Sequence, residues 1–94
     1  MLRFEFDPNK SRANKEKHGV DFFEAQALWE TDHLVIPAKN VKGENRYILL
    51  AKWRRKVYVA VFAKRGETRR LITCHRADKK LETIYARYKY EKVP

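Results

Sequence analysis

Three closely spaced runs of strand-forming residues between Asn45 and Arg76 constrain the fold of this chain most strongly. β-branched and aromatic residues dominate each run, which is typical of strands. The segments between the runs are too short for anything but hairpin turns, so consecutive strands must be antiparallel neighbours. The sequence therefore predicts a three-stranded meander, with strands over residues 45–53, 57–65 and 68–76.

The segments around the meander predict two further strands and three helices. Residues 1–6 alternate charged and aromatic side chains, which favours a short strand. Residues 33–39 favour a strand at the edge of the sheet, because Pro37 has no N–H to donate to a neighbouring strand. The expected fold class is therefore α+β in the order βααββββα, a mostly antiparallel sheet with helices packed on one face. Residues 1–94 are expected to form a single domain.

Candidate N-cap residues mark the start of each helix. They are Asp7 for residues 8–18, Asp21 for residues 21–30, and Asp78 for residues 78–91. Gly19 supplies the stop signal of the first helix. The interior of that helix is polar, so we expect it on the surface with Ala13 as its one small apolar contact.

The positive charge lies almost entirely in the second half of the chain. Residues 1–47 hold eight Lys and Arg and eight Asp and Glu, whereas residues 48–94 hold fourteen Lys and Arg against four Asp and Glu. The whole net charge of +10 therefore falls on the meander and the segment after it. This asymmetry favours a polyanionic partner, either RNA, DNA or an acidic protein segment.

Several other classes of protein fit the sequence poorly. A single cysteine excludes an internal disulfide framework and fits a reducing compartment. No apolar run approaches the roughly 20 residues of a membrane span, and the first residues lack a signal-peptide pattern, so we expect a cytoplasmic protein without a membrane partner. The histidines and Cys74 lack metal-ligand spacing and no glycine-rich phosphate loop is present, so no metal or cofactor is expected. Cys74 is expected to be a small buried residue.

A set of ordered motifs extends over nearly the whole chain. The motifs are Phe6-Asp7-Pro8, Asn14 to Gly19, Asp21-Phe22 with Glu24-Ala25, Glu44 with Arg46, Arg65, Arg70 to Thr73 leading to Ala77, and Glu82 with Tyr85. In this order they resemble the BrnT family. Three positions depart from the family pattern: Phe6 replaces a tryptophan, a basic turn at residues 54–56 replaces one with glycine, and His75 replaces an arginine.

The resemblance implies the toxin of a bacterial type II toxin–antitoxin pair. BrnT proteins are similar to RelE-type ribonucleases, with a compact sheet backed by helices that cuts RNA without a metal. The resemblance further implies a small BrnA-like antitoxin as the partner, and promoter DNA bound only through the toxin–antitoxin complex.

Metal-free RNA cleavage needs a base for the 2′-hydroxyl, cations for the charged phosphorane and an acid for the leaving oxygen. The resemblance and the charge pattern indicate four candidate catalytic residues: Glu44, Arg46, Arg65 and His75. Arg65 is the preferred phosphate contact, because the guanidinium fork suits phosphate oxygens. His75 is the preferred proton carrier, because histidine exchanges protons near neutral pH. Glu44 serves either as the base or as the partner that orients Arg46.

Further cations are candidate RNA contacts. They are Lys17, Arg54, Arg55, Arg69, Arg70 and Arg76. Lys17 also suits the negative end of the first helix, so its charge has a second explanation. Strict alternation along the third meander strand predicts that Arg70 and Arg76 point to one side and that Arg69 and His75 point to the other.

Three functions compete for this basic surface. The first is a ribonuclease toxin held by an antitoxin. The second is a nucleic-acid-binding module without catalysis, and the third is a module whose basic patch only receives an acidic antitoxin segment. A binder needs cations alone, whereas an enzyme also needs a positioned proton carrier, and in this sequence His75 and Glu44 are the candidates.

Overall fold

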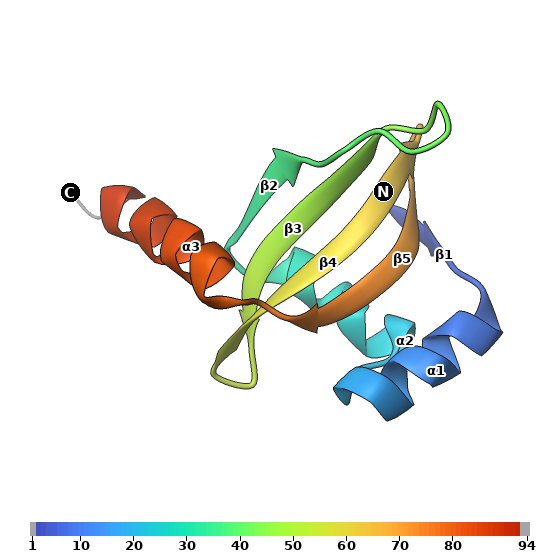
Figure 1. The fold of residues 1–94 in the computed structure, drawn as a ribbon, viewed down its shortest axis with the longest axis horizontal. Helices are drawn as coiled ribbons and strands as arrows, with labels where there is room; N and C mark the ends of the chain where they lie inside the picture. The colour runs from blue at the N-terminus through green and yellow to red at the C-terminus, as the bar shows by residue number, and fades with distance from the viewer. Residues whose placement is uncertain (1, 93–94) are drawn as a thin grey trace.

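The computed structural model describes residues 2–92 and contains a mixed five-stranded sheet in the order β1-β5-β4-β3-β2 (Figure 1). The strands are β1 (Arg3–Glu5), β2 (His33–Pro37), β3 (Arg46–Trp53), β4 (Lys56–Arg65) and β5 (Thr68–Arg76). The central strands β3, β4 and β5 form the antiparallel meander that the short connections predicted. Pro37 ends the edge strand β2, as its missing N–H requires. At the other edge β1 runs parallel to β5.

The helices begin where the sequence predicted their caps. They are α1 (Pro8–His18), α2 (Phe22–Ala25) with the following 3₁₀ turn η1 (Gln26–Glu30), and α3 (Lys79–Lys92). The Asp7 carboxylate accepts from the backbone N–H of Asn9, the second residue of α1, and Asp21 forms a reciprocal capping box with Glu24. Gly19 ends α1 at φ 76°, a left-handed conformation that glycine adopts without strain. The α+β class is thus confirmed.

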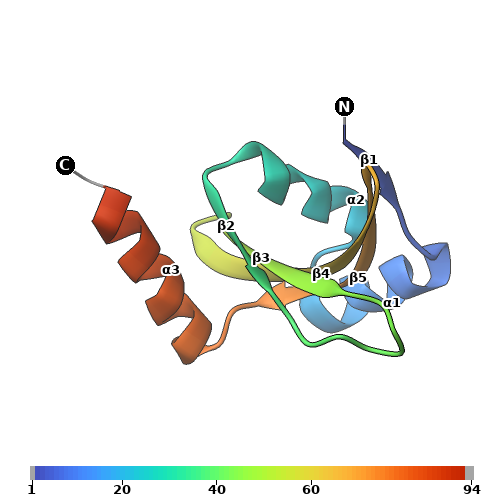
Figure 2. The ribbon, with the colours of Figure 1, turned by 90° about the horizontal axis from the view of Figure 1, so that it is seen from above.

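The helices pack on both faces of the sheet, so the expectation of helices on one face is wrong. Phe22 and Leu28 pack on the face that carries Leu49. Tyr85 of α3 packs with Leu50, the neighbour of Leu49 in β3, on the opposite face. Figure 2 shows α3 standing apart from the other helices. The middle of the meander is apolar on both sides, and each side therefore needs its own cover.

Helix α1 buries polar side chains rather than Ala13, which is exposed. The Asn14 amide donates to the carbonyl oxygens of Val20 and Cys74, both at 2.7 Å, and its oxygen accepts from the Cys74 N–H at 3.3 Å. The Ser11 hydroxyl accepts from the Phe22 N–H at 2.9 Å. These contacts satisfy backbone groups at the edge of β5 and in the turn after α1. The polar pattern of α1 is therefore explained by hydrogen bonding to buried backbone rather than by exposure.

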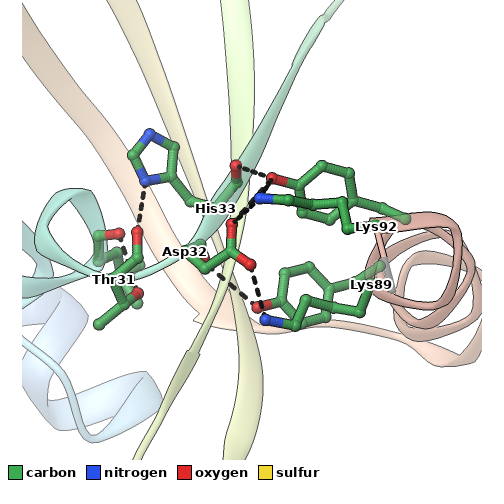
Figure 3. A network of polar contacts seen from close by, with 8 residues as sticks. Thr31, Asp32, His33, Lys89 and Lys92 are labelled. Carbon is green, nitrogen blue, oxygen red and sulfur yellow. Dashed lines mark hydrogen bonds and ion pairs between the residues drawn. The ribbon is translucent and has the colours of Figure 1, made fainter. Parts of the chain in front are cut away.

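Helix α3 is fastened to the start of β2 by a polar network around Asp32 (Figure 3). Lys89 and Lys92 donate to its carboxylate at 2.6 Å and 2.9 Å, and the Tyr88 hydroxyl donates to it at 2.9 Å. The Tyr85 hydroxyl donates to the Asp32 carbonyl oxygen at 3.0 Å. These donors, Lys89 first, hold the pKa of Asp32 well below its usual range.

Within residues 2–92 no helix is long and apolar enough to cross a membrane.

Replacing Asn14 with leucine tests the buried amide. Asn14→Leu keeps the number of side-chain heavy atoms and the branched shape but removes a hydrogen-bond partner from three backbone groups of Val20 and Cys74. We expect the free energy of unfolding in urea to fall by about 2–4 kcal/mol. Asn9→Leu on the exposed side of α1 is the matched control and should change it by less than about 0.5 kcal/mol. An Asn14→Leu variant as stable as the control would contradict this role.

The Asp32 network predicts a pH-dependent contribution to stability. Because the pKa of Asp32 is lower in the folded chain than its ordinary value of 3.8, the contribution is present above about that pH and disappears as the pH falls further. We expect Asp32→Asn to lower the thermal unfolding midpoint at pH 7. The difference from the wild-type chain should shrink steadily below pH ~4. A difference that does not depend on pH would show that the charge of Asp32 contributes nothing.

Candidate anion-binding site

The sheet face that carries α3 is built of rows that cross the strands, because paired residues of neighbouring strands point to the same face. The pairing defines three rows: Leu34, Leu50 and Val59; then Ile36, Ile48 and Val61; then Arg46, Ala63 and Arg70. Helix α3 packs over the first row. The second row is half-buried. We call the second and third rows together the open half of this face.

The arginine row joins three strands. Arg46 of β3 and Arg70 of β5 flank Ala63 of β4, which places their Cα atoms about 10 Å apart. The small side chain of Ala63 leaves room above it for the two long ones. Arg46 Nε is buried and has no hydrogen-bond partner among residues 2–92. Every other buried side-chain nitrogen or oxygen in these residues has one. A buried donor of this kind costs about 1–3 kcal/mol, which a bound anion would offset.

An arginine–glutamate cluster, made of Glu5, Glu44, Arg65 and Arg70, adjoins the arginine row. Arg65 Nη2 lies 3.0 Å from Glu44 Oε2, and Arg65 Nη1 lies 3.5 Å from Glu5 Oε1. Arg70 Nη1 lies 3.8 Å from Glu5 Oε2. Glu44, and to a lesser degree Glu5, raise the pKa of Arg65, which therefore stays charged. The Arg65 side chain is 56% exposed, so these pairs are weak and solvent can reach them.

Glu44 is held toward Arg65 by the turn before β3. The backbones of Val41 and Glu44 exchange hydrogen bonds of 3.0 Å and 2.9 Å. Gly43 adopts φ 78°, and its N–H donates to the Asn40 side chain at 3.0 Å. Residues 40–44 therefore form a tight turn. Glu44 is paired with Arg65 rather than with Arg46, the partner considered from the sequence.

His75 lies at the other end of β5, away from Arg65. His75 pairs with Val59, whereas Arg70 pairs with Ala63, four residues further along β4. The backbones of His75 and Arg70 are therefore roughly 13 Å apart. A bulge between Val61 and Phe62 of β4 leaves Ile72 unpaired in β5. The bulge breaks the strict alternation expected from the sequence, and Arg70 and His75 consequently share a face. The ring nearest to His75 is that of His18, at 5.4 Å between centroids.

The other predicted cations do not join the cluster, apart from Arg70. Arg54 and Arg55 form the β3–β4 turn, and both have positive φ. Arg54 lies 3.6 Å from Glu24 and 4.1 Å from the centroid of the Trp53 ring. These contacts place Arg54 on the sheet face that α2 covers. Arg69 donates to the Gly66 carbonyl oxygen at 2.9 Å. Lys17 and Arg76 are exposed and are the sequence neighbours of His18 and His75, respectively.

Two further residues bear on the site, and the sequence analysis did not select them as site residues. Glu5 reaches Arg65 and Arg70 because β1 pairs in parallel with β5, and the alternating pattern of residues 1–6 was its only signal. His18 meets His75 because α1 packs along β5. Cys74 is buried as expected, and burial raises the pKa of its thiol to about 12, which leaves no thiolate for nucleophilic attack. No group of three or more potential metal ligands occurs in the part of the chain that the structure describes.

Comparison with known proteins assigns this architecture to a family. A family model described as "Ribonuclease toxin, BrnT, of type II toxin-antitoxin system" matches residues 6–80. The match runs from Phe6, directly after β1, to the first turn of α3, and it includes His18, His75, Glu44 and the arginine row. A search of curated proteins finds no significant match.

Proposed function

Because the chain belongs to the BrnT family of ribonuclease toxins of type II toxin–antitoxin systems, we propose that it cleaves RNA without a metal ion, by attack of a 2′-hydroxyl on the adjacent phosphate. We further propose that the protein has a RelE-like fold and that a BrnA-like antitoxin neutralises it in the bacterial cytoplasm. In this proposal it contacts promoter DNA only as part of the complex with the antitoxin. The observation that carries the proposal is the row of arginines on a sheet face that α3 leaves half open.

Arg46, Arg65 and Arg70 bind the phosphates of RNA in this proposal. Exposed arginine–carboxylate pairs contribute only about 0.2–1 kcal/mol each, so a phosphate displaces Glu5 from Arg70 at small cost. Arginine accepts phosphate oxygens in a bidentate geometry and does not give up its proton, which suits stabilisation of the charged phosphorane.

Glu44 acts as a positioning residue. Its carboxylate lies 3.0 Å from Arg65 and is fixed by the turn, so it orients the guanidinium toward the open half of the face. The half-buried side chains of Ile36, Ile48 and Val61 form an apolar floor beside the arginine row, on which a ribose or a base of the bound strand rests. The arrangement binds phosphate on one side and an apolar group on the other, as single-stranded RNA requires.

Incubation of the purified chain with RNA in excess chelator tests the proposal. We expect cleavage that yields a 2′,3′-cyclic phosphate and a 5′-hydroxyl, and no cleavage where the attacking nucleotide lacks its 2′-hydroxyl. Arg65→Ala should lower the rate by about 10²-fold or more, and Arg65→Lys by less, because lysine keeps the charge but loses the fork.

Arg12→Ala is the matched control, since Arg12 is exposed on α1 and outside the arginine–glutamate cluster. It should cleave RNA at the wild-type rate. RNA that the wild-type chain binds but leaves intact would replace the nuclease with a binding module. Failure to bind RNA or DNA at low salt would leave an antitoxin-binding module.

A further inference from the structure

Two histidines from distant parts of the sequence meet at the end of β5. His18 is the last residue of α1 and His75 is the penultimate residue of β5, and their ring centroids lie 5.4 Å apart with the ring planes inclined at 44°. Both side chains are partly exposed. The pair lies outside the arginine–glutamate cluster described above.

The contact between the two rings is fixed by the buried amide of Asn14. Asn14 lies one helical turn before His18, so both side chains leave the same side of α1. The Asn14 side chain is hydrogen-bonded to both the N–H and the carbonyl oxygen of Cys74, the residue before His75. This double hydrogen bond sets the position of α1 along β5. The two imidazoles are therefore placed by the fold.

The hydrogen bonding of His75 determines which of its nitrogens exchanges a proton. Nδ1 lies 2.9 Å from the Arg76 carbonyl oxygen, which can only accept. Nδ1 therefore carries hydrogen in both charge states, and Nε2 is the nitrogen that gains or loses a proton.

Burial and neighbouring charge favour the neutral form of His18. Burial lowers the pKa of His18, and the neighbouring charges of His75 and Lys17 lower it further. Two imidazoles this close disfavour the state in which both are charged. Acid–base catalysis requires one neutral ring and one imidazolium, and His18 is the ring whose neutral form is favoured.

We propose that His18 and His75 are the acid–base pair of the RNA cleavage reaction, with His18 as the base and His75 Nε2 as the acid. His18 takes the proton of the 2′-hydroxyl while the 2′-oxygen forms a bond to phosphorus. The bond from phosphorus to the 5′-oxygen breaks, and His75 protonates that oxygen. The inference rests on the proposed ribonuclease function and assigns its proton carriers.

The surrounding cations fit the same reaction. Lys17 is exposed and is the sequence neighbour of His18, so it adds positive charge near the histidine pair. Arg76 pairs with Tyr58 and therefore points to the face opposite His75. The arginine row lies roughly 13 Å further along β5 on the face that His75 shares, so it holds the RNA strand at neighbouring phosphates.

Single substitutions of the three histidines test the pair. His18→Gln and His75→Gln should each lower the cleavage rate by about 10²-fold or more, with RNA affinity changed less than about twofold. His33→Gln is the matched control, because His33 also holds a backbone carbonyl oxygen through Nδ1, that of Thr31 at 2.7 Å, but has no second imidazole beside it. It should cleave at the wild-type rate. Thermal unfolding of each variant checks that it folds. His18→Asn, a second substitution at the same position, should lose activity in the same way.

A substrate with sulfur in place of the leaving 5′-oxygen separates the two roles. A thiolate leaves without a proton, so this substrate should restore cleavage by His75→Gln but not by His18→Gln. A folded His18→Gln variant that cleaves RNA like the wild-type chain, while Arg65→Ala does not, would overturn the assignment and leave the nuclease intact. A wild-type chain that cuts no RNA would overturn both proposals.

Discussion

The structure depends on a meander that is apolar on both of its faces. Leu49 and Leu50 are adjacent in β3 and both are fully buried, on opposite sides of the sheet. Helices must therefore cover both sides, and α3 covers only one end of the second side. The remaining end carries arginines in place of aliphatic residues. The same sheet thus provides both the core and the arginine row at its open end.

Two polar fastenings hold the helices to this sheet. The Asn14 amide joins α1 to the edge of β5, and the Asp32 carboxylate joins α3 to the start of β2. The first is buried and contributes chiefly through backbone groups that would otherwise lack partners. The second is exposed and weakens with acid. Only the first bears on the proposed chemistry, because it brings His18 to His75.

Local signals in the sequence predicted the elements well. Capping residues and hairpin lengths depend on neighbouring residues, so Asp7, Gly19 and the three meander strands were placed correctly. Contacts between distant segments were not predictable in this way. The bulge at Ile72, the parallel pairing that brings Glu5 to the cluster, and the meeting of His18 with His75 all depend on tertiary packing. Periodicity in a single segment carries no information about them.

The central claim is that RNA lies along β5 on the sheet face that carries α3, from the arginine row to the histidine pair at the β5 end of the first row. Backbone amide shifts in NMR, followed as a 2′-O-methyl RNA that cannot be cleaved is added, test it directly. The account predicts that the largest changes occur at Arg46, Ala63, Arg70 and His75. Changes confined to the turn at Arg54 and Arg55 would place the RNA on the other side of the molecule and contradict it.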